Sequence, residues 1–205
     1  MDIFLVRHGQ STGNGTGRLI GWSDHPLTAL GRAQAGAVAA RLASFGPMPV
    51  FCSDLTRARQ TAEVIAARWA GDIQPDTRWR EISCGRYEDC TWDDFNRNVE
   101  LALALDHDPL GAVMPEGESV EMMLARVHAA FGALCTTGEE RAVVVGHDGS
   151  IRSVLYNCLN IPPDRFWTFT TDHCGLTHLI ICEGWVSIRT VNDTSHLGDL
   201  LHSHR

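Results

Sequence analysis

Short apolar segments that run directly into polar, glycine-containing loops recur along this sequence, and they constrain its fold more than any other feature. Residues 3–6 precede an Arg-His-Gly loop, residues 50–52 precede a Ser-Asp pair, and residues 142–145 precede a Gly-His loop. The last of these runs is apolar without interruption, which is typical of a central parallel strand covered on both faces. Two more strand-like segments, 176–182 and 185–191, are punctuated by Asn, Asp and Gly and predict a strand pair at a sheet edge.

Segments with apolar residues at helical spacing alternate with these strands. They cover residues 29–43, about 53–69, 92–105, 118–135 and 151–159. Thr28 is a candidate N-cap for the first of them. The alternation predicts an α/β fold, a three-layer α/β/α sandwich with a mostly parallel central sheet. No domain boundary is visible, so we expect a single domain over residues 1–205, with an insertion at about 82–118 that caps a site.

The net charge, the spacing of the cysteines and the lack of a long apolar segment indicate which partners and which cellular location to expect. There are 17 Lys and Arg against 25 Asp and Glu, a net charge of -8, so binding of nucleic acid through a basic surface is not expected. No segment has the character of a secretory signal or a membrane span, and none of the seven cysteines forms a Cys-x-x-Cys pair. We therefore expect reduced thiols, a cytoplasmic location and no membrane partner. His202 and His204 offer two metal-ligating side chains near the C-terminus, but a histidine-rich tail is more often solvated, so a metal site is not expected there.

Histidine and arginine side chains follow three of the predicted strands, at the sheet edge where such folds place their sites. Arg7 and His8 follow one strand, His147 follows another, and Arg57 lies in the first turn of a helix, where anions are stabilised. Guanidinium groups match phosphate oxygens, and a neutral imidazole is a competent nucleophile toward phosphorus. Glu81, in a fourth loop, is suited to protonating a departing alkoxide. Each residue also has a structural interpretation by itself, so the prediction of a phosphoryl site rests on several loops meeting at one edge.

These residues belong to an ordered set of motifs that resembles the histidine phosphatase superfamily, the phosphoglycerate mutase-like group. The motifs are Arg-His-Gly-Gln-Ser at 7–11 with Asn14, Gly-Trp-Ser-Asp at 21–24, Pro-Leu-Thr at 26–28, Ser-Asp-Leu at 53–55 with Arg57, Arg-Glu at 80–81, Pro-Glu-Gly-Glu-Ser at 115–119 with Arg126, and Gly-His at 146–147. The resemblance spans nearly the whole chain. Residues 115–119 and 192–197 look closest to bacterial members such as the cobalamin-pathway α-ribazole phosphatases and the broad-specificity phosphatases.

The resemblance implies a role for each site residue. His8 would be the nucleophile and pass through a phosphohistidine, Glu81 would be the acid and then the base, and Arg7, Arg57 and His147 would hold the phosphoryl oxygens. Further substrate contacts are expected from Asn14, Gly21, Ser53 and Asp148, although Asp148 is as well suited to capping the next helix. Neither a metal nor a cofactor is expected, because the arginines and His147 stabilise the charge. The expected partner is a small phosphorylated metabolite, and a homodimer is left open.

Two other functions stay open beside the phosphatase. Glycolytic mutases of the family carry a hydroxyl residue where this chain has Ile20, and a basic insertion where it has residues 101–115, which contain no Lys or Arg. This difference favours a phosphatase that hydrolyses a small phosphomonoester over a cofactor-dependent phosphoglycerate mutase. A catalytically silent binding or regulatory member is the second alternative, and the presence of all the expected catalytic residues speaks against it.

Overall fold

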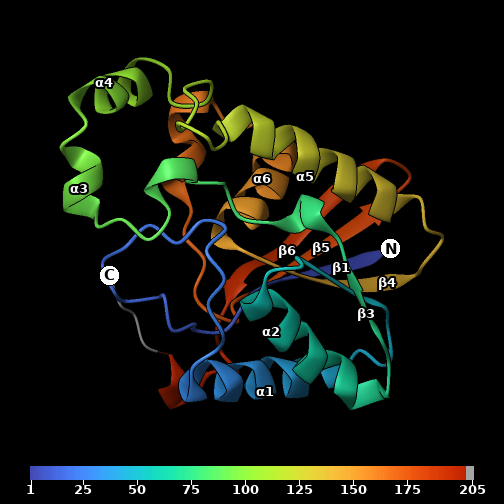
Figure 1. Ribbon diagram of the computed structural model, residues 1–205. Helices are drawn as coiled ribbons and strands as arrows, with labels where there is room; N and C mark the ends of the chain where they lie inside the picture. The colour runs from blue at the N-terminus through green and yellow to red at the C-terminus, as the bar shows by residue number, and fades with distance from the viewer. Residues whose placement is uncertain (202–205) are drawn as a thin grey trace.

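A mixed six-stranded sheet forms the centre of the protein, with strand order β3-β2-β4-β1-β5-β6 in the computed structural model, which describes residues 1–201 (Figure 1). The strands are β1 (Asp2–Arg7), β2 (Val50–Cys52), β3 (Ile73–Pro75), β4 (Arg141–Gly146), β5 (Leu176–Cys182) and β6 (Trp185–Asp193). Strands β1 to β4 are mutually parallel, whereas β5 and β6 form an antiparallel pair at one edge. The predicted mostly parallel sheet with an edge pair is therefore confirmed.

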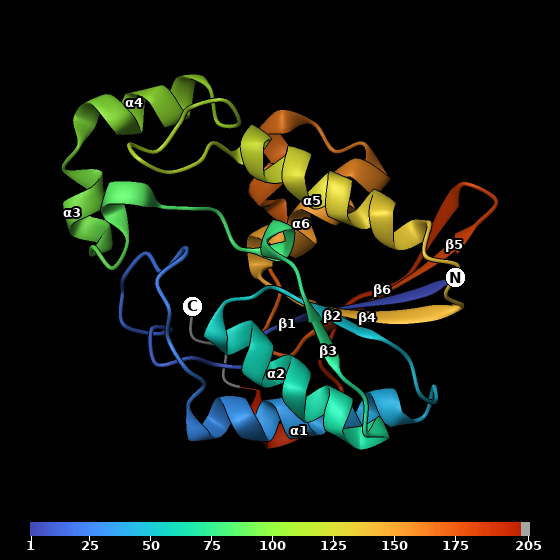
Figure 2. The same cartoon turned by 45° about the vertical axis from the view of Figure 1, so that its right-hand side comes forward.

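Helices cover both faces of this sheet, as the three-layer prediction requires. Helices α1 (Ala29–Ala43) and α2 (Thr56–Ala66) lie on one face, and α5 (Val120–Cys135) and α6 (Asp148–Leu159) lie on the other (Figures 1 and 2). Alternate residues of the central strands enter the two cores. Phe4 and Val6 pack toward α1 and α2, while Ile3 and Leu5 belong to the opposite cluster. Burial on both faces explains why these strands are apolar without interruption.

The helix starts follow from local capping. Thr28 Oγ1 accepts a hydrogen bond from the Gly31 amide at 3.0 Å, as predicted for the N-cap of α1. Helix α2 starts at Thr56, later than the prediction from about residue 53. The residues before it have other partners, because Ser53 Oγ accepts from the Leu55 amide at 3.3 Å and Asp54 pairs with Arg80 at 2.6 Å. Arg57 is in the first turn of α2 all the same.

The cap segment, residues 82–118, lies beside the carboxyl ends of the parallel strands (Figure 2). The prediction of one helix over 92–105 was wrong, since the segment contains two helices, α3 (Trp92–Asn96) and α4 (Val99–His107). The break has a local cause, because Asn98 Oδ1 accepts from the Leu101 amide at 3.0 Å and starts a new helix. Phe95 and Leu101 then pack with Leu19, which attaches the cap segment to the loop after β1.

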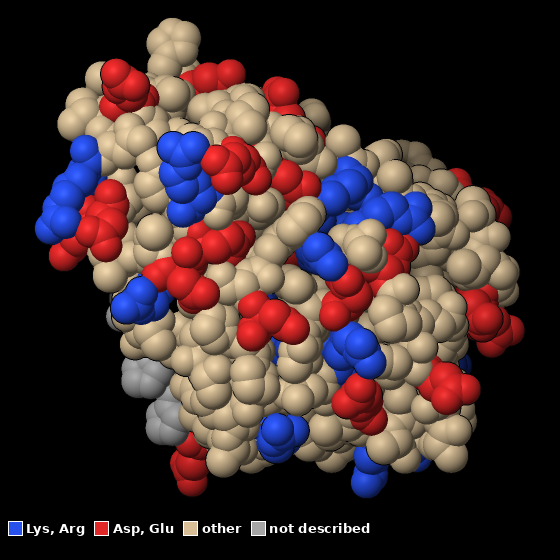
Figure 3. Space-filling model, viewed as in Figure 1, with Lys and Arg blue, Asp and Glu red and all other residues tan. Residues whose placement is uncertain are grey.

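Acidic and basic side chains are interspersed on the face shown in Figure 3, with no large area of one sign. Within residues 1–201, no helix is both long enough and apolar enough to cross a membrane. The histidines at 202 and 204 lie outside the described residues.

Candidate active site

Two histidines that follow adjacent strands and an arginine from the first turn of α2 meet at the carboxyl edge of the sheet. His8 follows β1 and His147 follows β4, the adjacent parallel strand, and their ring centroids are 5.0 Å apart. Arg57 enters from α2 and donates from Nε to His8 Nε2 at 3.2 Å. The exposed fractions are 3% for His8, 0% for His147 and 2% for Arg57. The fold thus gathers into one buried cluster residues that are far apart in the sequence.

The hydrogen bonds of His8 define its tautomer. Nδ1 lies 2.7 Å from the Gly9 carbonyl oxygen, which can only accept, so Nδ1 carries the proton. Nε2 is then unprotonated and faces the site. Burial, and next the nearby Arg57 and His147, hold the pKa of His8 well below its usual value. The ring is therefore a neutral imidazole whose Nε2 lone pair accepts a weak hydrogen bond from Arg57 at 3.2 Å. An unprotonated Nε2 is the form that can attack an electrophile once that bond is given up.

The His147 ring has no hydrogen-bond partner for either nitrogen among the described residues, although both atoms are buried. Only its backbone is held, through donation from the amide to Ser150 Oγ at 2.8 Å. Burial, followed by Arg57 and Arg7, lowers the pKa of His147 well below its usual value. A buried polar group without a partner costs about 1–3 kcal/mol, and both ring nitrogens of His147 remain available for a hydrogen bond. Arg7 Nε is unpartnered in the same way.

Glu81 contributes a carboxylate to the same cavity. Its Oε1 accepts from the Ile82 amide at 2.9 Å and its Oε2 from the Gly149 amide at 3.1 Å. The close approach to α6 depends on the glycine, because a Cβ atom on Gly149 would clash with Glu81 Oε1. These contacts hold the carboxylate at the wall of the cavity while both of its oxygens can still accept or give a proton.

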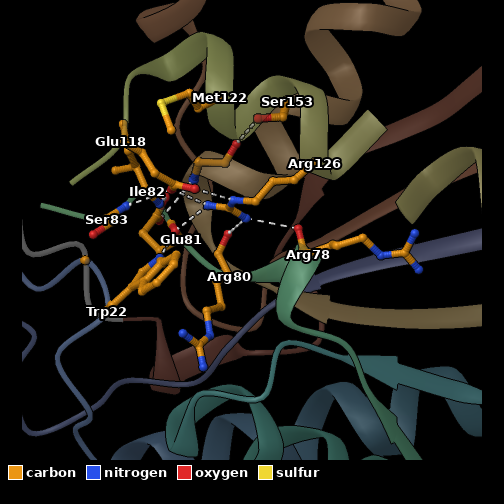
Figure 4. A network of polar contacts seen from close by, with 12 residues as sticks. Trp22, Arg78, Arg80, Glu81, Ile82, Ser83, Glu118, Met122, Arg126 and Ser153 are labelled. Atoms are coloured by element: carbon orange, nitrogen blue, oxygen red, sulfur yellow. Dashed lines mark hydrogen bonds and ion pairs between the residues drawn. The ribbon is translucent and has the colours of Figure 1, made fainter. Parts of the chain in front are cut away.

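Arg126 of α5 holds the loop that carries Glu81 (Figure 4). Its Nη1 donates to the carbonyls of Arg78 and Arg80 at 3.0 and 2.7 Å, and its Nη2 donates to the Glu81 carbonyl at 2.7 Å. Glu118 neutralises the guanidinium through two short contacts of 2.8 Å. The sequence marked Arg126 only as a motif residue. The sequence did not predict its structural role, because its acceptors are backbone carbonyls. Every residue carries a backbone carbonyl, so residue types do not show which ones Arg126 contacts.

Glu88 connects the loop after β1 to the Glu81 loop. Its carboxylate accepts from the backbone amides of Trp22, Ser23 and Cys84, each at 2.8 Å. Trp22 in turn donates from its indole to the Glu81 carbonyl at 2.6 Å. The two loops are therefore held as one wall of the cavity, and the position of the Glu81 backbone is fixed from two sides.

The structure places Asn14, Gly21 and Ser53 differently. Asn14 and Gly21 line the cavity, but Asn14 Oδ1 already accepts from Ser11, and the Gly21 carbonyl accepts from Arg57 Nη2 at 2.7 Å. Ser53 is buried beneath α2 and is not among the lining residues. Its hydroxyl supports the start of that helix, so the arrangement gives Ser53 a structural role in place of the predicted substrate contact.

Asp148 lines the cavity, yet its carboxylate is occupied. It pairs with Arg152 at 2.5 Å and accepts from the amide and hydroxyl of Thr171 at 2.8 and 2.9 Å. The Thr171 carbonyl accepts from Arg7 Nη1. Asp148 thus acts on the site through Thr171 and Arg7, a link that neither of the two sequence interpretations included. His173, which also was not anticipated, lies with its ring centroid 5.6 Å from that of His8.

The cavity beside these groups has a volume of about 540 Å³. His147 is fully buried and is not among its lining residues, and it reaches the site through its ring contact with His8. His8, Arg7, Arg57 and Glu81 form its charged end, and the cap segment supplies much of the remaining wall. Among residues 1–201, no group of three or more His, Cys, Asp or Glu side chains is arranged to hold a metal ion. The charged end offers guanidinium groups, unpartnered nitrogens, one nucleophilic atom and one carboxylate, which together can bind and transfer a tetrahedral anion.

The buried histidines give the stability a defined pH dependence. In the folded chain the pKa values of His8 and His147 lie well below 6.5, so below pH 6.5 the unfolded chain takes up protons that the folded chain does not. We expect the free energy of unfolding to decrease as the pH falls through that window. His147→Gln should weaken this dependence in urea titrations at pH 7.5 and 5.5. The exposed His128→Gln is the control and should leave it unchanged, and equal acid sensitivity of both variants would contradict the assignment.

Comparison with known proteins gives a consistent family. The model of the histidine phosphatase superfamily (branch 1) matches residues 3–194. Curated relatives include a probable phosphoglycerate mutase GpmB of Proteus mirabilis, 33% identical over 98% of this chain and 96% of that protein, and one of Escherichia coli, 32% identical over 96% and 95%.

Solved structures give the same result for the fold. A putative α-ribazole-5'-P phosphatase from Escherichia coli superposes with a TM-score of 0.87 at 25% identity, covering 94% of this chain and 96% of that one. The native structure of a mycobacterial glucosyl-3-phosphoglycerate phosphatase gives 0.84 at 26% identity, over 94% and 99%. The relatives thus carry both mutase and phosphatase names.

Proposed function

Because this chain belongs to the histidine phosphatase superfamily, branch 1, we propose that it is a phosphatase that hydrolyses a small phosphomonoester through a phosphohistidine on His8, without a metal. One observation carries the proposal. His8 presents an unprotonated Nε2 beside Arg57 and within a ring contact of His147, whose two nitrogens are buried without a partner among the described residues. A bound phosphoryl group would supply the acceptor atoms that His147 and Arg7 lack.

The first step transfers the phosphoryl group to His8. Nε2 attacks phosphorus, the bond from phosphorus to the ester oxygen breaks, and Glu81 gives its proton to the departing alkoxide. Arg7, Arg57 and His147 stabilise the charge on the three other oxygens. The Nδ1 proton shared with the Gly9 carbonyl keeps the ring in the attacking orientation and delocalises the positive charge that the ring gains.

The second step returns His8 to its free form. Glu81, now a carboxylate, takes a proton from water, the water oxygen attacks phosphorus, and the bond from phosphorus to Nε2 breaks. Inorganic phosphate leaves and the imidazole regains its lone pair. One carboxylate serves as acid and then as base, which fits the position of Glu81 on the cavity wall with its hydrogen bonds coming from backbone amides.

Phosphoglycerate mutase activity is the second candidate, and the names of the curated relatives favour it. A mutase must hold a doubly phosphorylated intermediate in both orientations, which calls for cations around its second anionic group. Residues 101–115 of the cap segment contain no Lys or Arg. A screen of phosphorylated metabolites with and without 2,3-bisphosphoglycerate distinguishes the two. Release of inorganic phosphate supports the phosphatase, and cofactor-stimulated interconversion of phosphoglycerates would establish the mutase instead.

The role of Glu81 predicts a dependence on the leaving group. In Glu81→Gln, we expect kcat/KM for alkyl phosphates to fall about 100-fold or more, because the alkoxide then departs without a proton. The loss for p-nitrophenyl phosphate should be much smaller, since its leaving group needs little protonation. The amide of glutamine preserves one acceptor for the backbone amides, which limits the structural change. Equal losses for both classes of ester would exclude Glu81 as the acid.

A further inference from the structure

The wall of the cavity beyond its charged end is apolar and partly aromatic. Trp92 and Phe95 of α3, Leu105 of α4, Met114 and Trp167 all line it. The volume of about 540 Å³ lies in the range of pockets that enclose a whole small molecule. A phosphate ion occupies only the end near His8, so most of the cavity surrounds the group to which the phosphate is esterified.

The charged residues of this wall, apart from those assigned to the chemistry, already have partners. Glu118 pairs with Arg126 at 2.8 Å, Asp148 pairs with Arg152 at 2.5 Å, and Arg18 donates to the Asp89 carbonyl. Arg18 is the one cation among these lining residues, and it is exposed to solvent. An exposed ion pair contributes little to affinity, whereas a carboxylate placed against the apolar wall loses its hydration without compensation.

We propose that this wall is a subsite for an uncharged, largely apolar leaving group, so that the substrates are aryl or long-chain alkyl phosphomonoesters and not esters that carry a second anionic group. The inference rests on the proposed phosphatase function and adds the substrate class to it. The indole rings of Trp92 and Trp167 and the flexible side chain of Met114, which line this part of the cavity, suit an aromatic or aliphatic body. Each methylene group buried there favours binding by about fourfold.

Three phenolic esters test the proposal with the wild-type protein. They are phenyl phosphate, 4-butylphenyl phosphate and 4-(2-carboxyethyl)phenyl phosphate, whose phenols are of nearly equal acidity, so the chemical step is matched. We expect kcat/KM to be about tenfold or more higher for the butyl ester than for phenyl phosphate. The carboxyethyl ester should be no better than phenyl phosphate, because its carboxylate has no buried partner.

Substitution of Trp92, which lines the apolar wall, tests the subsite within the protein. It is 53% exposed, so Trp92→Ala leaves the core intact, and the variant should lose most of the advantage of the butyl ester with a smaller loss for phenyl phosphate. Trp92→Lys should shift the preference toward the carboxyethyl ester. Trp185→Ala is the matched control, because Trp185 is 81% exposed on β6 and does not line the cavity. It should change neither value.

The outcomes separate the two proposals. Hydrolysis with a preference for the carboxyethyl ester, or an unchanged butyl preference in Trp92→Ala, would overturn the apolar subsite and leave the phosphatase standing. A preference for the carboxylate would also point to Arg18 as its anchor. No hydrolysis of any of the three esters by the wild-type protein would contradict the phosphatase function, and the subsite inference would fall with it.

Discussion

We expect His8→Ala to abolish turnover of every phosphomonoester, with a loss in kcat on the order of 10⁴-fold or more, because the nucleophile of the proposed covalent mechanism is removed. The reason is geometric. His8 Nε2 is the unprotonated ring atom beside Arg57, and the neighbouring His147 lies with its ring edge-on at an interplanar angle of 61°. In His8→Ala no ring nitrogen remains at this position to form the bond to phosphorus, so the covalent intermediate cannot form.

Trapping the phosphohistidine intermediate tests directly whether His8 is the nucleophile. Acid-labile, alkali-stable label from a ³²P-phosphomonoester should appear on the wild-type protein after a rapid quench and should be missing from His8→Ala. His147→Ala is the comparison, because it removes a neighbouring imidazole and should slow labelling while leaving the same labelled residue. Label retained by His8→Ala would assign the nucleophile elsewhere, and a normal thermal transition of the variant shows that it is folded.

Arg57→Lys should lower kcat/KM by about 100-fold or more and destabilise the fold by a few kcal/mol. Arg57 donates one hydrogen bond within the protein from each of its three guanidinium nitrogens, which leaves two N–H groups for a ligand. Nε donates to His8, Nη1 to the Ser23 carbonyl at 2.8 Å and Nη2 to the Gly21 carbonyl at 2.7 Å. A lysine ammonium retains the charge but cannot span these three acceptors, so buried carbonyls lose their donors and the loop at 21–23 loses its anchor.

The matched control is Arg59→Lys on the same helix. Arg59 is half exposed and reaches Glu63 only at 3.9 Å, so its replacement should change kcat/KM and the unfolding free energy little. Steady-state kinetics and urea denaturation of both variants give the two quantities. Activity of Arg57→Lys within a few-fold of wild type would show that charge alone suffices and that the fork of donors has no part in holding the phosphoryl group.

Local sequence patterns predict most of the helices and strands of this fold. The strand at 50–52 has the bounds that its apolar run predicts, because a parallel strand covered on both faces is apolar along its length. The strand at 176–182 also has the predicted bounds, although it contains Thr177 and His178. Strand β3 was not predicted, since a three-residue segment with Gln and Pro carries no periodic signal. The division of 92–105 into two helices was also missed, because the asparagine that caps the second helix outweighs a continuous helical pattern.

The order of residues along the chain predicts which groups lie at the carboxyl edge of the sheet. The carboxyl ends of parallel strands lie along one edge of the sheet, so residues that follow different strands come close together there. For this reason the sequence predicts that His8, His147 and Arg57 belong to one site. Only the folded chain shows which of them face each other and which tautomer His8 adopts. It also shows that Ser53 supports the start of α2, that Asp148 binds Arg152 and Thr171, and that Arg126 and Glu88 hold the Glu81 loop. Several of these contacts join side chains to backbone groups far along the chain, as between the Glu88 carboxylate and the Trp22 amide, which are 66 residues apart. Backbone groups are the same at every position, so only the folded chain can select which of them a side chain meets.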